Sequence, residues 1–251
     1  MFNLNEGIFR TLITDLLPWQ RWTIEILFVL AIIIVSYLFG SINSSIIISK
    51  LLYKDDIRKY GSGNAGMTNM LRTFGKKAAL LTLVGDLAKT ALAILFAAVL
   101  FGFRYIYGIS YTDYCYVAGL FAVLGHVFPI FYKFKGGKGV LATATMAMIL
   151  APIPFVILLL LFIAIVWASK YVSLGSVCAA TMLPVVVSGY IKFLELPTLG
   201  IMMLSLILLA IFIVWCHREN LRRISERTER KISFGGGKKE KIEEKKADDA
   251  E

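Results

Sequence analysis

Apolar residues run along this chain in long uninterrupted stretches separated by short polar connections. A helix of about 20 apolar residues is long enough to cross the hydrocarbon core of a membrane. The pattern therefore predicts an all-α integral membrane protein with about seven transmembrane helices. We expect the spans near residues 24–52, 78–103, 114–132, 139–151, 153–169, 174–192 and 198–216.

The fourth of these spans, 139–151, is short. About twelve residues rising 1.5 Å each reach only about 18 Å, against a hydrocarbon core of roughly 30 Å. Length alone would favour a re-entrant segment. Pro152 and Pro154 follow directly, and proline ends helices and forms turns. We therefore expect a tight outer turn between a short fourth helix and the fifth.

Lys and Arg concentrate in the connections 53–77 and 133–138 and in the stretch after residue 216. Cytoplasmic loops of membrane proteins are rich in these residues. With the N-terminus outside, all three stretches lie in the cytoplasm only if the number of spans is odd. Seven spans meet this condition and six do not, so the predicted C-terminus is cytoplasmic.

The two ends of the chain differ from the membrane domain expected over residues 23–232. Residues 1–22 combine apolar positions at helical spacing with two tryptophans, which is typical of an interfacial segment. We expect no cleaved signal peptide, because no basic region with a small-residue cleavage site precedes the first apolar run. Residues 233–251 are rich in Gly, Lys and Glu and are expected to form a disordered cytoplasmic tail.

The composition is typical of a membrane protein and argues against a nucleic-acid-binding, disulfide-linked or zinc-binding protein. Of 251 residues, 58% are hydrophobic and 18% are charged, and the mean hydropathy is +0.73. The net charge of +10 does not indicate nucleic-acid binding, because the cations lie between and after apolar runs, where they set membrane orientation. Three scattered cysteines indicate neither a disulfide framework nor a zinc site, and no metal cluster is visible.

The connection 61–76 reads Gly-Ser-Gly-Asn-Ala-Gly-Met-Thr-Asn-Met-Leu-Arg-Thr-Phe-Gly-Lys and contains no acidic residue. Glycine N–H groups can curl around an anion, and Arg72 can hold phosphate through two hydrogen bonds. Ser62 and Asn64 add neutral donors. The stretch predicts a phosphate-binding loop, and the alternative is a flexible turn. Its glycines spell GxGxxG, but that pattern indicates dinucleotide binding only within a βαβ unit.

A second candidate anion site, Lys135-Gly136-Gly137-Lys138-Gly139, lies immediately before a predicted helix. The N-terminus of a helix favours negative charge, so a phosphate is expected between the two lysines. Anchoring at the cytoplasmic face would explain the lysines without a ligand, but not the glycines beside them.

The third candidate stretch is 215–224, where His217, Glu219 and Asn220 emerge at the cytoplasmic end of the last span. Histidine can act as a base near neutral pH, and Asn220 would share its helix face. Taken alone, the stretch slightly favours an ordinary interfacial histidine. The other histidine, His126, is expected only to hold a backbone carbonyl.

Asp86 and Lys89 lie inside the second predicted span at i, i+3 spacing. A lone charge at the centre of a membrane helix costs roughly 2.5–3.5 kcal/mol on insertion scales, so the two are expected to pair. A functional and a structural role are equally compatible with the sequence, because a buried ion pair can also fix helix register.

Together the three stretches resemble the motifs of the bacterial acyl-phosphate-dependent glycerol-3-phosphate acyltransferases, over roughly residues 40–232. The resemblance implies a seven-helix enzyme of the inner membrane with its active site at the cytoplasmic face. It implies transfer of an acyl group from acyl phosphate to glycerol-3-phosphate, giving lysophosphatidic acid and phosphate, as the first acylation of phospholipid synthesis. It implies no cofactor, no use of acyl-CoA or acyl carrier protein, and a functional link to an acyl-phosphate-forming enzyme and to membrane lipids.

The resemblance also assigns residues. Those that it makes catalytic are Ser62, Arg72, His217 and Asn220. Those that it makes substrate-binding are Gly61, Gly63, Asn64, Gly66, Asn69, Lys135, Gly136, Gly137, Lys138, Gly139 and Ser173. It makes Glu219 structural. Two positions depart from the family pattern, since Met67 stands where alanine is general and Asn43 where proline is common.

A transporter of phosphorylated solutes is the alternative function, since it would also need cations and glycine-interrupted helices. Transporters bind substrate near the midplane of the membrane, usually between repeated halves. Here the motifs gather at one face and no internal repeat is evident, which favours the enzyme. The His-x4-Asp motif of the other glycerol-3-phosphate acyltransferase type is absent, because Phe131 and Arg222 stand five residues after the two histidines.

Overall fold

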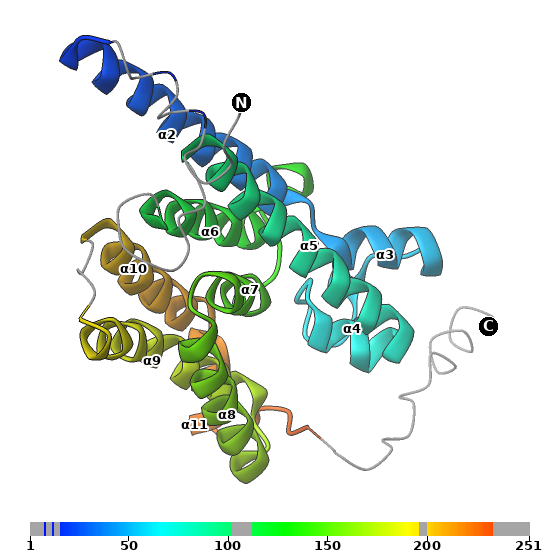
Figure 1. Ribbon diagram of the computed structural model, residues 1–251. Helices are drawn as coiled ribbons and strands as arrows, with labels where there is room; N and C mark the ends of the chain where they lie inside the picture. The colour runs from blue at the N-terminus through cyan, green and yellow to red at the C-terminus, as the bar shows by residue number, and fades with distance from the viewer. Residues whose placement is uncertain (1–7, 9–11, 13–15, 102–111, 196–199, 233–251) are drawn as a thin grey trace, which may run out of the picture.

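A computed structural model describes residues 8, 12, 16–101, 112–195 and 200–232. The predicted tail 233–251 and most of the predicted interfacial segment 1–22 lie outside these residues. All the regular structure within them is helical (Figure 1). The elements are α2 Pro18–Ser41, α3 Ser44–Tyr53, η1 Ile57–Lys59, α4 Met67–Phe74, α5 Lys76–Phe101, α6 Thr112–Val127, η2 Ile130–Tyr132, α7 Val140–Leu150, α8 Pro152–Ser169, α9 Val172–Phe193, α10 Gly200–Cys216 and α11 Arg218–Ser225.

Five helical segments of the described chain are long and apolar enough to cross a membrane. They are Pro18–Tyr53, Lys76–Phe101, Asp113–Tyr132, Pro152–Ser169 and Val172–Phe193. A sixth results if α10 and α11, bent by 52°, are counted as one span. These findings establish a multi-pass, all-helical architecture, and the helices fall within a few residues of the predicted spans.

The first predicted span, 24–52, is interrupted, which the sequence analysis did not anticipate. Helix α2 ends at Ser41, and Asn43 starts α3 by accepting a hydrogen bond from the Ile46 N–H at 3.1 Å. Asparagine is among the strongest N-capping residues. The apolar pattern continues through this cap, so hydrophobicity alone could not reveal the break.

The short fourth helix is present as α7, which has 11 residues. Ala151 leaves the helical conformation, with φ −146° and ψ 66°, and Pro152 begins α8 at its first position. Proline suits this position because the first N–H groups of a helix have no partner within it. A tight turn between the two helices is therefore confirmed, but it lies at Ala151, and both prolines stand in the first turn of α8. Its place on the outer side of the membrane stays a prediction. Helix α7 packs against α5, α6, α8 and α9, at the centre of the bundle (Figure 1).

Helices α2 and α6 approach each other closely at two glycines. A Cβ added to Gly40 would lie 2.1 Å from the Ala122 carbonyl oxygen, and one added to Gly125 would lie 2.2 Å from that of Tyr37. Small residues allow such close packing of helices in membranes. The α2–α6 pair therefore forms a closely packed wall of the bundle.

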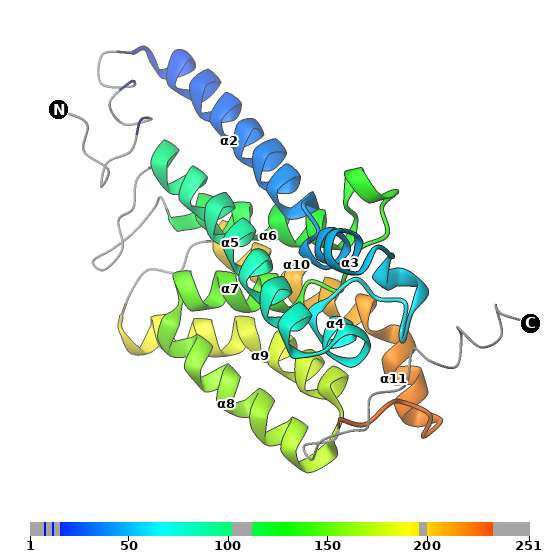
Figure 2. The ribbon, with the colours of Figure 1, turned by 90° about the vertical axis from the view of Figure 1, so that its right-hand side faces the viewer.

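Helices α3, α4 and α11 gather at one end of the bundle, as Figure 2 shows. The loops that contain the first two candidate motifs lie at the same end, between α3 and α4 and between η2 and α7. Chain segments separated by about 150 residues in the sequence therefore meet there.

Candidate active site

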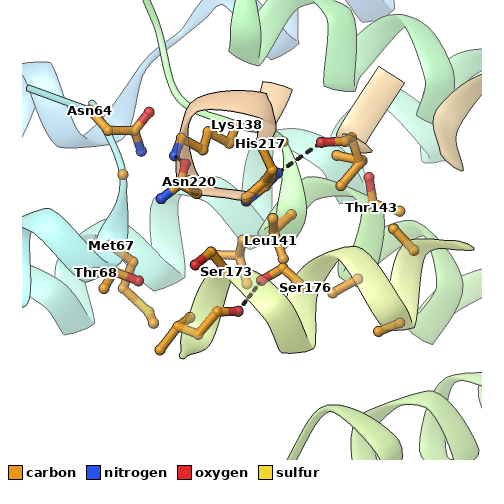
Figure 3. A pocket seen from close by; sticks show the side chains of 18 of the residues that line it. Asn64, Met67, Thr68, Lys138, Leu141, Thr143, Ser173, Ser176, His217 and Asn220 are labelled. Atoms are coloured by element: carbon orange, nitrogen blue, oxygen red, sulfur yellow. Dashed lines mark hydrogen bonds between the residues drawn. The ribbon is translucent and has the colours of Figure 1, made fainter. Parts of the chain in front are cut away.

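A cavity of about 720 Å³ lies at this end of the bundle. Much of its polar lining comes from the three candidate stretches and from α9 (Figure 3). It includes Ser62, Asn64, Arg72, Lys138, Ser173, Ser176, His217 and Asn220. Its apolar lining comes from α7, α8 and α9 and includes Val140, Leu141, Ala147, Phe155, Leu158, Phe162, Ala180 and Leu183. Cations and an apolar wall thus border one space.

The Asn69 side chain holds the first loop in shape. Its amide nitrogen donates to the carbonyl oxygens of Tyr60 at 2.9 Å and Asn64 at 3.1 Å, and its oxygen accepts from the Ser62 N–H at 3.1 Å. Gly61 has a φ of +59°, and a Cβ there would lie 2.2 Å from the Asn69 oxygen, so only glycine fits. Asn69 and Gly61 both border the cavity, but they act on it through the loop.

The second half of the first stretch is helical rather than a loop. Helix α4 begins after Gly66, and it places Met67, Thr68 and Arg72 along the cavity. Arg72 is thereby carried by a helix, which holds a side chain more firmly than a loop does. Gly63, in contrast, is exposed and does not border the cavity.

The two lysines of the second stretch are separated by the fold. Lys138 borders the cavity and donates a hydrogen bond to the Asn220 side-chain oxygen, whereas Lys135 is exposed and outside the lining. The N–H groups of Gly136 and Gly137 donate to the carbonyls of Val127 and His126, both at 3.1 Å. These amides hold the loop against the end of α6 and are not available to an anion in this structure.

The Lys138 ammonium group is largely buried. Burial lowers the pKa of its ammonium group to about 8, and the neighbouring Arg223 and Arg72 guanidinium groups act in the same direction. The Glu229 carboxylate opposes the shift. A second negative charge, such as a phosphate, would stabilise the protonated ammonium further.

The His217 ring has a defined proton arrangement. It is 3% exposed, and its Nδ1 lies 2.8 Å from the Ile213 carbonyl oxygen. Because a carbonyl oxygen can only accept, Nδ1 must donate, and a neutral ring then has a lone pair on Nε2. The ring borders the cavity with this acceptor available. Glu219, two residues later, is exposed and outside the lining.

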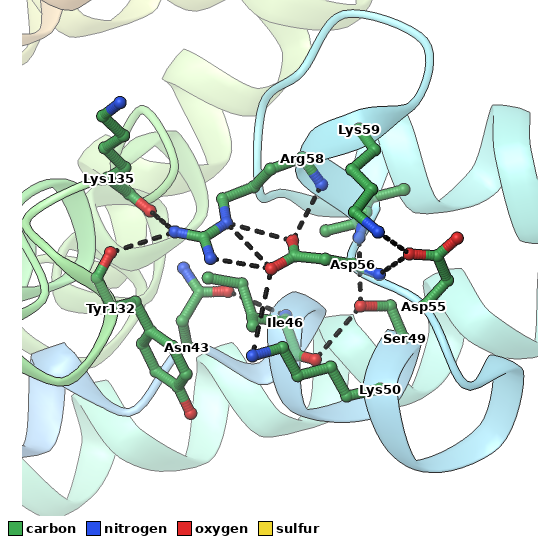
Figure 4. A network of polar contacts seen from close by, with 11 residues as sticks. Asn43, Ile46, Ser49, Lys50, Asp55, Asp56, Arg58, Lys59, Tyr132 and Lys135 are labelled. Carbon is green, nitrogen blue, oxygen red and sulfur yellow. Dashed lines mark hydrogen bonds and ion pairs between the residues drawn. The ribbon is translucent and has the colours of Figure 1, made fainter.

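Arg58 ties the first two loops together (Figure 4). Its guanidinium group donates to both oxygens of Asp56 and, through Nη1, to the carbonyl oxygens of Tyr132 at 2.9 Å and Lys135 at 3.2 Å. The hydrogen bond from Arg58 is the main cause of a lowered pKa at Asp56. A charge that the sequence analysis assigned only to membrane orientation therefore has a local structural role.

Comparison with known proteins decides the family. The family model described as glycerol-3-phosphate acyltransferase matches residues 30–227. This chain belongs to the glycerol-3-phosphate acyltransferase family. A relative of that name from Syntrophomonas wolfei is 40% identical over 203 residues, covering 81% of this chain and 96% of the relative. One from Bacillus subtilis is 38% identical over 204 residues, covering 81% and 97%.

Solved structures agree with this assignment. The crystal structure of PlsY, described as an integral membrane glycerol 3-phosphate acyltransferase in its glycerol 3-phosphate form, has 31% identity and a TM-score of 0.70. It covers 82% of this chain and 96% of its own. The lysophosphatidic acid form has 30% identity and a TM-score of 0.68, with coverage of 82% and 95%. The protein is thus an acyltransferase that is integral to the membrane.

In this acyltransferase Asp86 and Lys89 form the predicted ion pair, at 2.9 Å. The Lys89 ammonium also donates to the Ile42 carbonyl oxygen at 2.9 Å and to His126 Nδ1 at 2.8 Å. The expectation that His126 holds a backbone carbonyl was wrong for its side chain, which accepts from Lys89 instead. Asp86 and His126 border the cavity, so the pair lies next to the candidate active site.

Glu229 is a residue of the candidate site that no sequence motif indicated. Its carboxylate accepts hydrogen bonds from Ser173, Asn220 and Arg223. It lies beyond the recognised motifs, in a charged stretch that looks like an ordinary solvated segment. The sequence offered little signal, because Glu229 and Glu226 both stand among basic residues and look alike. Among the described residues, His, Cys, Asp and Glu do not form groups of three or more that could hold a metal ion.

Proposed function

We propose that this protein transfers an acyl group from acyl phosphate to glycerol-3-phosphate, giving lysophosphatidic acid and phosphate. The proposal rests on one observation: the cations Arg72 and Lys138 and a set of apolar side chains line the same cavity. Both proposed substrates carry a phosphate, and the donor also carries a long apolar chain. The names of the relatives support the acceptor, and the two PlsY structures support acceptor and product. Support for the acyl phosphate donor is the motif resemblance.

The proposed chemistry needs alignment more than activation of the donor. Acyl phosphate is a mixed anhydride with a good leaving group, so the site must place the glycerol hydroxyl against the carbonyl and compensate two phosphates. The hydroxyl oxygen bonds to the carbonyl carbon, and the bond to the phosphate oxygen breaks with its electron pair on phosphate. The hydroxyl proton passes to His217 Nε2 or to a phosphate oxygen of the substrate.

Arg72 and Lys138 are the proposed phosphate ligands, and Ser62 and Asn220 orient the substrates. The cations lie on α4 and just before α7, on two sides of the cavity that contains His217. Lys135 has no proposed contact with substrate, because its side chain is exposed outside the lining.

The acyl chain is proposed to lie along the apolar lining from α7, α8 and α9. These side chains form a continuous apolar surface beside the polar groups. Exposing a long alkyl chain to water would cost roughly 0.8 kcal/mol for each CH₂. Entry between helices from the lipid would keep the chain out of water throughout.

The proposed location is the bacterial inner membrane, with the cavity at the cytoplasmic face. Loops 53–77 and 133–138 and the stretch after residue 216 carry the Lys and Arg excess typical of that side. In this arrangement α7 and α10 complete seven crossings, the N-terminus is outside, and residues 23–232 form the membrane domain. A product of phospholipid synthesis would be released directly into the lipid.

The test is an acylation assay with purified protein in lipid vesicles. Radiolabelled glycerol-3-phosphate is supplied with palmitoyl phosphate or with palmitoyl-CoA, and labelled lysophosphatidic acid is measured. Product from palmitoyl phosphate alone is the expected result. Product from palmitoyl-CoA alone would overturn the donor, and uptake of glycerol-3-phosphate into vesicles without any product would indicate a transporter.

A further inference from the structure

The stretch after α11 folds back over the cavity and forms part of its wall. The N–H groups of Thr228 and Glu229 donate to the Arg223 carbonyl oxygen, at 2.8 Å and 3.1 Å. The Ile232 N–H donates to the Lys170 carbonyl oxygen at 2.8 Å, which fastens the stretch to the turn between α8 and α9. Thr228, Glu229 and Arg230 border the cavity.

Within this stretch the Glu229 carboxylate is held from several sides. One oxygen accepts from the Ser173 hydroxyl at 2.8 Å and from the Asn220 amide nitrogen at 2.7 Å. The other accepts from Arg223 Nε at 2.8 Å. The Glu229 side chain is only 10% exposed. Hydrogen bonds to an ionised acceptor are about twice as strong as neutral ones, so these contacts fix all three partners, which border the cavity.

The orientation of the Asn220 amide follows from its two neighbours. A carboxylate can only accept, so the amide nitrogen must face Glu229, and an ammonium can only donate, so the amide oxygen must face Lys138. Glu229 therefore orients the Asn220 amide so that its oxygen, and not its nitrogen, faces the Lys138 ammonium group. Without the carboxylate the amide is free to turn its nitrogen toward Lys138, where donor would meet donor.

We propose that Glu229 is a positioning residue of the phosphate-binding site, which fixes the Ser173 hydroxyl and, through Asn220, the Lys138 ammonium group for the substrate. The inference rests on the proposed function, because it assumes that this polar region holds the phosphate of glycerol-3-phosphate. Glu229 itself makes no contact with substrate in this scheme. A carboxylate facing phosphate directly would repel it, whereas Glu229 acts through Asn220 and keeps the Lys138 donor aimed. The Ser173 hydroxyl donates its only proton to Glu229 and therefore presents an acceptor to a substrate hydroxyl.

The same carboxylate has an electrostatic effect on Lys138. The charged and titratable groups that face Lys138 are Arg72, Cys216, His217, Arg223 and Glu229. Among them the two arginines favour the neutral amine and Glu229 favours the ammonium. Burial lowers the Lys138 pKa to about 8 even with Glu229 present. Loss of the negative charge lowers that pKa further, so the cation is lost at a lower pH.

The experiment compares Glu229→Gln and Glu229→Asp with Glu226→Gln as a matched control. Gln keeps the shape of Glu229 but offers one acceptor and one donor, and Asp keeps the charge on a shorter stem. Glu226, three residues earlier, pairs with Arg222 at the surface. Three quantities are measured: kcat and KM for both substrates between pH 6 and 9, the affinity for glycerol-3-phosphate by calorimetry, and the unfolding temperature in detergent.

Glu229→Gln is expected to lower kcat/KM for glycerol-3-phosphate by about 10- to 100-fold, the size of one lost hydrogen bond between charged groups. Its alkaline loss of activity is expected at a lower pH than in the wild type, whereas Glu229→Asp keeps the wild-type midpoint. Glu226→Gln is expected to change none of these quantities. A purely structural role would lower the unfolding temperature and leave the pH midpoint in place.

Unchanged kcat/KM and pH midpoint in Glu229→Gln would overturn the inference. Tighter binding of glycerol-3-phosphate would overturn it as well, since the carboxylate would then compete with the phosphate. If Glu229→Gln fails to fold, Glu229→Asp provides the test. Its expected result is weaker binding of glycerol-3-phosphate with an unchanged pH midpoint of activity. Wild-type protein without acylation activity would instead reject the proposed function, and the calorimetric comparison would still test Glu229.

Discussion

Lys135 and Lys138 are three residues apart, yet only Lys138 reaches the cavity. Lys138→Met is expected to lower kcat/KM by about 10- to 100-fold, because it removes a charged donor from a partly buried phosphate site. Lys135→Met is expected to cost less than about fivefold, since an exposed charge contributes about 1 kcal/mol or less. Steady-state acylation assays check both variants. Equal losses would show that the phosphate lies outside the cavity, between the two lysines.

His217 donates from Nδ1 to the Ile213 carbonyl, and its Nε2 is the proposed base. In His217→Asn the side-chain amide can occupy the place of Nδ1 and keep this hydrogen bond, but it has no basic nitrogen. The expected result is a fall in kcat of about 10²- to 10⁴-fold, typical of a lost general base, with an unchanged unfolding temperature.

Retained kcat in His217→Asn would assign the proton to a substrate phosphate. A fall in both kcat and the unfolding temperature would indicate that His217 has a structural role. Calorimetric binding of glycerol-3-phosphate separates these outcomes from a binding defect.

Much of the polar lining could be predicted from residue types, because charged, titratable and amide side chains are unusual in so apolar a chain. These residues are Arg72, Lys138, His217 and Asn220. The direction of a side chain could not be predicted. Whether Lys135 or Lys138 enters the cavity depends on a loop held by α6 and by Arg58, both remote in sequence. Glu229 was missed for the same reason, since its three partners become neighbours only after folding.

At the scale of elements, one buried ammonium group joins three helices. Lys89 on α5 pairs with Asp86, donates to the end of α2 at Ile42, and donates to α6 at His126. Lys89→Met leaves the Asp86 charge without its partner in a buried place. Breaking a buried ion pair from one side typically costs about 3–5 kcal/mol, and thermal unfolding in detergent is expected to show a loss of that order.

The control is the double variant Asp86→Asn with Lys89→Met, which removes both charges. It is expected to recover most of the lost stability, because an uncompensated charge is the main cost. If the double variant is as unstable as Lys89→Met alone, the hydrogen bonds of Lys89 to the helix ends, and not its ion pair, stabilise the bundle.

The sequence predicted the long helices well, because a membrane sets a minimum apolar length that polar connections interrupt. The prolines marked the turn between α7 and α8 for the same kind of local reason. The break at Asn43 and the helix α4 were not predicted. The first depends on one side-chain cap inside an apolar run, and the second lies in a glycine-rich stretch whose composition indicates a loop.

At the scale of the whole molecule, the proposed topology places the two ends of α9 on opposite sides of the membrane. Its 22 residues span about 33 Å, from Ser173 at the cavity to Glu195 just beyond its end. In a cysteine-free variant, Glu195→Cys is expected to react with a membrane-impermeant maleimide added to intact spheroplasts. Phe134→Cys, also exposed, is expected to react only after permeabilisation. The reverse pattern would invert the proposed orientation.

Because the chain folds back after α11, the wall of the candidate cavity extends beyond the region that the family model matches. The matched region ends at residue 227, and the cavity wall continues through Thr228, Glu229 and Arg230 to the contact between Ile232 and Lys170. A gene trimmed to the matched region would encode every recognised motif and still leave the candidate cavity open on one side. Fusion partners and truncations therefore belong after Ile232.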